Sequence, residues 1–130
     1  MDPSRKPRRR DVWLWQATLV GYGLTLFVAT HVPRSLPLLP PHRVDKLLHA
    51  LAFAILAWLL AEAWQRSAGR LSGPHLRAAW LAVALYAALD ELTQIPVGRL
   101  CSGFDWLADV VGAAAGLLVF FAWHRGTRRQ

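Results

Sequence analysis

Four apolar runs, separated by polar and proline-containing segments, set the pattern of this chain. They cover residues 12–30, 45–64, 76–96 and about 105–123. Each run is close to the ~20 residues that an α-helix needs to cross the hydrocarbon core of a bilayer. The pattern therefore predicts an all-α protein, a four-helix transmembrane bundle.

The third run is the least apolar of the four. Its uninterrupted apolar part extends only from Ala78 to Leu89, and Asp90, Glu91 and Gln94 follow directly. Ionisable groups are costly inside a membrane. We therefore expect this run to cross the bilayer only if the other helices shield these three side chains from lipid.

The length of 130 residues allows one domain at most. We expect a basic, disordered arm at 1–11, the membrane domain at 12–124 and a basic tail at 125–130. A basic segment before an apolar run also resembles a signal peptide. The first run exceeds the ~7–15 residues of such a peptide's apolar region, so we expect it to be retained as the first helix.

The charge pattern predicts the partner and the orientation. The formal net charge is +7, and the basic residues gather outside the apolar runs. Alternation with apolar runs favours membrane lipids over nucleic acid as the partner. If the N-terminus is inside, the inner segments hold most of the Lys and Arg, as the positive-inside rule requires. We therefore expect a multi-pass protein of the bacterial cytoplasmic membrane with both termini cytoplasmic.

This topology brings the polar ends of all four spans to the outer side of the membrane. At 1.5 Å per residue, the deeper side chains are expected roughly 6–9 Å below the interface. The sequence thus predicts one polar pocket that faces outwards. Its candidate members are His31, Asp45, Lys46, His49, Asp90, Glu91, Gln94, Arg99, Asp105 and Asp109.

Helix packing is predicted by small residues in the fourth run. Gly112 and Gly116 continue the helical stripe of Asp105 and Asp109. A G-x-x-x-G spacing lets a second helix approach closely. We therefore expect a helix–helix contact directly below the acids.

These motifs resemble those of the VanZ-like family. The chain has D-K-x-x-H at Asp45, D-E-x-x-Q at Asp90, then Arg99, and D-x-x-x-[ND]-x-x-G at Asp105. The resemblance covers about residues 15–120, and Asp109 stands where the family usually has asparagine. It implies a small integral membrane protein with a cell-envelope role, and the namesake is associated with low-level resistance to the glycopeptide teicoplanin.

The residues themselves leave several functions open. The pocket could bind the headgroup of a lipid or of a lipid-linked envelope precursor, with Arg99 holding a phosphate or carboxylate. The chain could instead be an intramembrane enzyme acting on such a molecule, with His49 as general base beside Asp90 and Glu91. The same polar residues could also form a purely structural network in an accessory membrane subunit.

Metal binding and ion transport are less favoured by the sequence. His49 with Asp45, Asp90 or Glu91 would suit Zn²⁺ or Mn²⁺. There is no H-E-x-x-H motif and no cysteine pair, so we expect neither a metal nor another cofactor. The acids gather on one side of the membrane, which disfavours a transport path.

Five other residues have simple predicted roles. Glu62 is expected to be solvated at the end of the second helix, and His42, His75 and His124 are expected to be solvated in loops or at helix ends. Cys101 is the single cysteine, so an intrachain disulfide is excluded, and we expect it to be an incidental turn residue.

Overall fold

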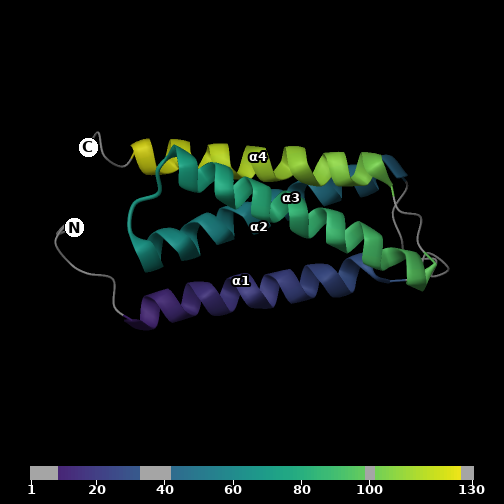
Figure 1. The fold of residues 1–130 in the computed structure, drawn as a ribbon, viewed down its shortest axis with the longest axis horizontal. Helices are drawn as coiled ribbons and strands as arrows, with labels where there is room; N and C mark the ends of the chain where they lie inside the picture. Colours follow the sequence, from purple (N-terminus) through teal and green to yellow (C-terminus); the bar gives the residue numbers. More distant parts are fainter. Residues whose placement is uncertain (1–8, 33–41, 99–101, 127–130) are drawn as a thin grey trace.

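The computed structural model describes residues 9–32, 42–98 and 102–126. Over these residues the chain forms four α-helices and one short 3-10 helix (Figure 1). Their bounds are Arg9–Thr30 for α1, His42–Ala68 for α2, Gly73–Gln94 for α3, Ile95–Val97 for η1 and Gly103–Gly126 for α4. The predicted all-α, four-helix fold is therefore confirmed.

The helices are longer than the apolar runs that predicted them. α1 already begins at Arg9, and α2 extends from His42 to Ala68 instead of from Asp45 to Trp64. The apolar pattern marks the part of a helix that is suited to lipid. Polar residues such as those at the start of α2 continue the helix into the interface, where the hydropathy pattern no longer detects it.

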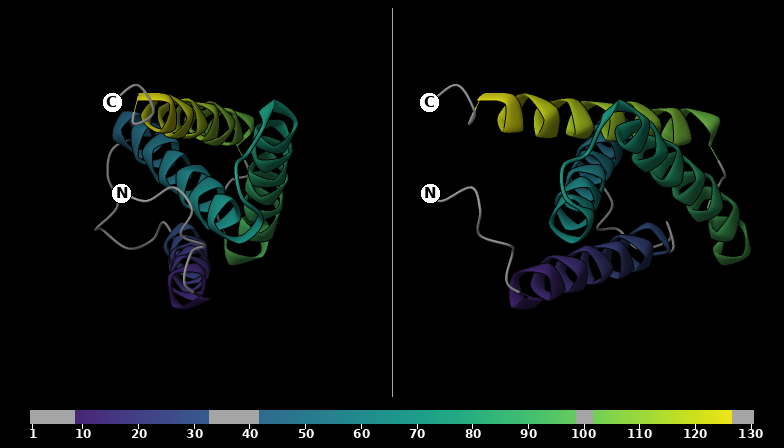
Figure 2. Two further views of the ribbon diagram at one scale, coloured as in Figure 1. Left: turned by 90° about the vertical axis from the view of Figure 1, so that its left-hand side faces the viewer. Right: turned by 60° about the vertical axis from the view of Figure 1, so that its left-hand side comes forward.

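The four helices alternate in direction along the chain (Figure 1). α2 and α4 run in the same direction and form the most extensive contact, while α3 packs on α4 and, to a lesser degree, on α2. α1 packs mainly on α2, and among the described residues it makes no contact with α4 (Figure 2). The start of α1 and the end of α4 therefore lie at one end of the molecule, and the polar helix ends lie at the other.

Two glycines place α4 directly against the backbone of α2. A Cβ on Gly112 would lie 2.7 Å from the Cα of Ala50, and one on Gly116 would lie 2.9 Å from the Cα of Ala54, with the carbonyl oxygens closer still. No side chain fits at such distances. G-x-x-x-G on one helix thus faces A-x-x-x-A on the other, and this close contact fixes the register of the two helices.

The surface of the molecule is strongly apolar. Along α3, an exposed stripe of leucines (Leu81, Leu85, Leu89 and Leu92) runs opposite a buried face of Ala79, Val83, Ala87, Asp90 and Gln94. A water-soluble protein rarely exposes so large a continuous apolar patch. The outward leucines and inward polar groups are typical of a protein whose solvent is lipid.

Three of the helices are long and apolar enough to cross a membrane: Arg10–Thr30, Val44–Ala68 and Gly103–Gly126. α3 is the remaining long helix among the described residues. The sequence predicts that α3 crosses the bilayer only if the other helices shield its polar end from lipid. This condition is met, because Asp90 is 2 % exposed, Glu91 3 % and Gln94 2 %.

Candidate functional site

The polar helix ends converge on one largely buried group of side chains, which we call the polar cluster. The end of α3 lies near the end of α1, and the starts of α2 and α4 lie together at the same end of the molecule (Figure 1). The cluster consists of Thr30 from α1, Lys46 and His49 from α2, Asp90, Glu91 and Gln94 from α3, and Asp105 and Asp109 from α4.

Asp90 connects α3 to α1. Its Oδ1 accepts a hydrogen bond from the Thr30 hydroxyl at 3.0 Å, and its Oδ2 accepts one from the Gln94 amide at 3.0 Å. The His31 ring lies nearby, with Nδ1 3.8 Å from Oδ1 of Asp90. Both carboxylate oxygens of Asp90 therefore have partners, and the link that this acid makes between two helices is enough to explain its burial.

Asp105 and Lys46 form an ion pair between α4 and α2 at the outer edge of the cluster. The Asp105 side chain is nearly buried, whereas that of Lys46 is 45 % exposed. The Lys46 ammonium also lies 5.6 Å from the centre of the Phe104 ring. Lys46 thus neutralises Asp105 and still faces the edge of the cluster.

Deeper in the molecule, His49 contacts Asp109. The two atoms His49 Nδ1 and Asp109 Oδ1 are 3.0 Å apart, and both side chains are buried. Asp109 is 0 % exposed. Among the residues that the structure describes, its Oδ2 has no hydrogen-bond partner. A buried carboxylate oxygen without a partner costs about 1–3 kcal/mol, so this atom is not explained by packing.

Glu91 completes the deep part of the cluster. Its Oε2 accepts a hydrogen bond of 2.8 Å from the backbone N–H of Ser102, just before α4. One ligand atom each from His49, Glu91 and Asp109 lies within 4.8 Å of the others. Three helices therefore bring one imidazole and two carboxylates to a single buried point.

The remaining candidates of the sequence analysis divide into three sets. Asp45 lies in the first turn of α2 and is half-buried. Arg99 and Cys101 lie outside the described residues. Gly112 and Gly116 lie one and two turns beyond Asp109, at the contact with α2.

Sequence reasoning missed two members of this neighbourhood. Thr30, which binds Asp90, and Ser102, which binds Glu91, are common residues without a motif of their own. The available signal was position: each stands where an apolar helix ends or begins, on the side that holds the acids. A hydroxyl or a free backbone N–H at such an end is a natural donor to a buried carboxylate.

The prediction that Glu62 is solvated is wrong. Glu62 is 5 % exposed; its Oε2 lies 3.3 Å from Arg66 Nε, and its Oε1 lies 3.2 Å from His124 Nε2. The Arg66 guanidinium in turn stacks over the Trp15 ring at 4.6 Å. This second polar group lies at the opposite end of the molecule. Arg66 of α2 and His124 of α4 both contact the Glu62 carboxylate, and the stacking of Arg66 on Trp15 adds α1.

The prediction for His124 needs a similar correction, whereas the prediction that His75 is solvated is confirmed. His124 is half-buried and packs on the Phe120 ring, with Nδ1 3.0 Å from the Phe120 carbonyl oxygen. His75 is exposed and serves in the capping box of α3, where its Nδ1 accepts the backbone N–H of Ser72 at 3.1 Å. The prediction for His42 concerns a side chain that lies outside the described ones.

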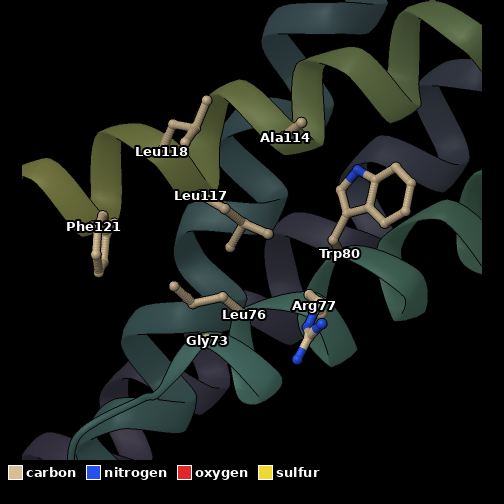
Figure 3. Close-up of a pocket in the computed structure, with 8 residues that line it drawn as sticks. All are labelled: Gly73, Leu76, Arg77, Trp80, Ala114, Leu117, Leu118 and Phe121. Atoms are coloured by element: carbon tan, nitrogen blue, oxygen red, sulfur yellow. The ribbon is translucent and has the colours of Figure 1, made fainter.

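A cavity of about 570 Å³ lies between α3 and α4, away from the polar cluster (Figure 3). It lies beside the first half of α3 and the second half of α4, and its lining is almost entirely apolar. The lining residues are Gly73, Leu76, Arg77, Trp80, Ala114, Leu117, Leu118 and Phe121. The Trp80 indole N–H donates to the carbonyl of Val110 at 3.1 Å, which fixes one wall. An apolar groove of this kind offers no group for chemistry.

Fold and site together define a multi-pass helical membrane protein with a buried, partly acidic cluster at one end of its helices. The chain belongs to the VanZ/LLP1 family, whose family model matches residues 6–124. The match confirms the resemblance drawn from the motifs, and it includes every member of the polar cluster. No curated protein and no solved structure matches the chain.

Proposed function

We propose that the chain crosses the bacterial cytoplasmic membrane four times, with both termini in the cytoplasm and the polar cluster on the outer side. The excess of Lys and Arg in the segments then assigned to the inside supports this orientation. The leucine stripe that runs along α3 from Leu81 to Leu92 supports a fourth crossing, since it gives that helix a lipid-facing side past Asp90.

Within this orientation, the polar cluster serves as a binding site for the polar headgroup of a lipid or a lipid-linked envelope precursor. The observation that supports this most is the unpaired Oδ2 of Asp109, buried beside His49 and Glu91. A buried acceptor without a partner is costly, and a donor or cation supplied by a ligand would offset that cost. Lys46 pairs with Asp105 at the edge of the cluster, and because its side chain is 45 % exposed it is also open to contact from an anionic headgroup. Such a site suits a cell-envelope role, with glycopeptide tolerance as one form of it.

Titration with short-chain lipids tests this proposal. The protein is titrated in detergent with a short-chain polyprenyl phosphate and with short-chain phosphatidylcholine, and binding is followed by intrinsic Trp fluorescence. We expect the phosphate monoester to bind and Lys46→Gln to weaken it at least ~10-fold, since a charge-assisted contact is worth about 1.5–3 kcal/mol. Arg70→Gln, an exposed cation at the other end of the helices, is the matched control. Equal binding of both lipids, or no effect of Lys46→Gln, would contradict the proposal.

A second candidate function is catalysis with His49 as general base. The contact between His49 Nδ1 and Asp109 Oδ1 favours it, because a carboxylate commonly orients the imidazole of a catalytic base. Under this hypothesis Asp109→Asn lowers turnover of a bound phospholipid or precursor much more than its binding. Mass spectrometry of lipids incubated with the purified protein would detect the product, and lipids left unchanged by both wild type and variant would exclude it.

A further inference from the structure

We infer that His49, Glu91 and Asp109 form a binding site for one divalent cation of the Zn²⁺ or Mn²⁺ class. The inference deepens the proposed headgroup site. It rests on that proposal in one respect, because the headgroup supplies the ligand for the coordination position that the protein leaves open. The three residues come from three different helices, α2, α3 and α4. All three are buried, and their ligand atoms lie within 4.8 Å of one another.

The other acids of the cluster already have partners, which singles out these two carboxylates. Asp90 accepts hydrogen bonds from Thr30 and Gln94, and Asp105 pairs with Lys46. Glu91 has only a backbone N–H and Asp109 only the imidazole as partner among the described residues. When both are ionised, the two carboxylates beside one imidazole carry a net negative charge inside the protein. A divalent cation would neutralise it where the described residues place no Lys or Arg.

The distances fit ligands that share an ion. Two atoms bound to one Zn²⁺ at about 2.0–2.1 Å are about 2.9–3.4 Å apart at octahedral to tetrahedral angles. His49 Nδ1 and Asp109 Oδ1 are 3.0 Å apart. The ion would replace the hydrogen bond between them, and the unpaired Oδ2 of Asp109 lies on the same carboxylate. The ligand atoms of all three residues lie within 4.8 Å of one another, so a small shift of the Glu91 side chain brings its carboxylate to the same ion.

The donor set defines the class of ion and what it would bind. One imidazole with two carboxylates suits Zn²⁺ and Mn²⁺, whereas Ca²⁺ and Mg²⁺ prefer oxygen ligands alone. Three protein ligands leave a coordination position open, as in sites that bind water or a substrate oxygen. A phosphate oxygen of the proposed headgroup suits this position. His49 would then act as a metal ligand and not as a base.

Metal content of the full chain tests the inference directly. The protein is purified in detergent with a tag that contains no histidine, and metals are measured by mass spectrometry. The stripped protein is then titrated with Co²⁺, whose visible absorption reports nitrogen and oxygen ligands. We expect about one ion per chain. We expect Asp109→Asn and Glu91→Gln each to weaken binding by at least ~100-fold, because loss of a residue that only supports a metal ligand already costs about 10–100-fold.

Glu62→Gln is the matched control, because Glu62 is also a buried acid beside a histidine but has no second carboxylate near it in the described structure. It should leave metal binding unchanged. Less than about one tenth of an ion per chain in the wild type, both as purified and after titration, would overturn the inference. Equal binding by wild type, Asp109→Asn and Glu91→Gln would overturn it as well, since the ion would then sit elsewhere.

The lipid titration in the presence of EDTA separates this inference from the proposed function. Phosphate-lipid binding that depends on Lys46 but shows no bound metal supports the headgroup site and overturns the metal site. One metal ion per chain without any lipid binding supports the metal site and overturns the headgroup site.

Discussion

At the scale of single residues, the polar cluster contains two kinds of acid. Asp90 and Asp105 have partners that neutralise or satisfy them, and they join helices to one another. Asp109 is fully buried with an unpaired oxygen, and Glu91 accepts one backbone N–H. Acids of the first kind stabilise the fold, whereas an acid of the second kind is destabilising unless something binds it.

The hydrogen bond from Thr30 to Asp90 gives a prediction for the first kind. Thr30→Val removes the donor and leaves Asp90 with one partner fewer at a buried site, so we expect a loss of about 1–3 kcal/mol in stability. Unfolding of the detergent-solubilised protein, followed by circular dichroism, measures it. Thr25→Val is the control, because the Thr25 hydroxyl donates only to Gly21 within its own helix. Equal loss in both variants would show that Asp90 does not depend on Thr30.

Sequence could identify the charged members of the cluster but not their pairing. The spacing of Asp45, Lys46 and His49 places them near one helix end, and the alternation of spans brings these ends together. Whether Lys46 meets Asp105 or Asp90 depends on helix rotation and register, which no local pattern encodes. For the same reason the sequence predicts a solvated Glu62, because its partner His124 lies 62 positions further along the chain.

At the scale of elements, the close contact between α2 and α4 holds the site together. This contact places His49 opposite Asp109 and Lys46 opposite Asp105, one turn further out. The sequence predicted Gly112 and Gly116 as packing residues but could not name the partner helix. The A-x-x-x-A at Ala50 and Ala54 is one of many alanine spacings in α2, so only the structure distinguishes it.

Substitution of Gly112 tests the contact. Gly112→Ala places a Cβ 2.7 Å from the Ala50 Cα, and because backbone cannot yield, we expect a loss of at least ~2 kcal/mol. Thermal unfolding in detergent measures it. Gly21→Ala is the matched control, because a Cβ there meets nothing within 4 Å in the described structure. It should keep or raise stability through the ~0.5–1 kcal/mol by which alanine exceeds glycine in a helix. A harmless Gly112→Ala would mean that the helices are further apart.

At the scale of the whole molecule, gathering the cluster on one side of the membrane requires four crossings. Hydropathy alone finds three candidate spans, because Asp90 and Glu91 interrupt the apolar pattern of α3. The sequence set a condition for the fourth crossing, and the burial of both acids meets it.

The single cysteine makes the topology testable by thiol labelling. Cys101 lies between α3 and α4 in the sequence and is the only thiol of the chain. We expect a membrane-impermeant maleimide to label it from outside in spheroplasts. Ser67→Cys in a Cys101→Ala background, at the other end of α2, should be labelled only after lysis. The reverse pattern would place the cluster on the inner side, and labelling of both from outside would mean that α3 does not cross.

The central claim is that the deep part of the polar cluster, formed by His49, Glu91 and Asp109, is a ligand site and not a structural network. The most direct test compares the thermal stability of wild type, Asp109→Asn and Glu62→Gln in detergent with EDTA. The amide oxygen introduced by Asp109→Asn can still accept the hydrogen bond from His49, and the ionisable carboxyl group with its unpaired Oδ2 is gone, so we predict an unchanged or higher Tm. Glu62→Gln should lower Tm, because both Glu62 oxygens are paired. A Tm for Asp109→Asn that falls as far as that of Glu62→Gln would contradict the claim.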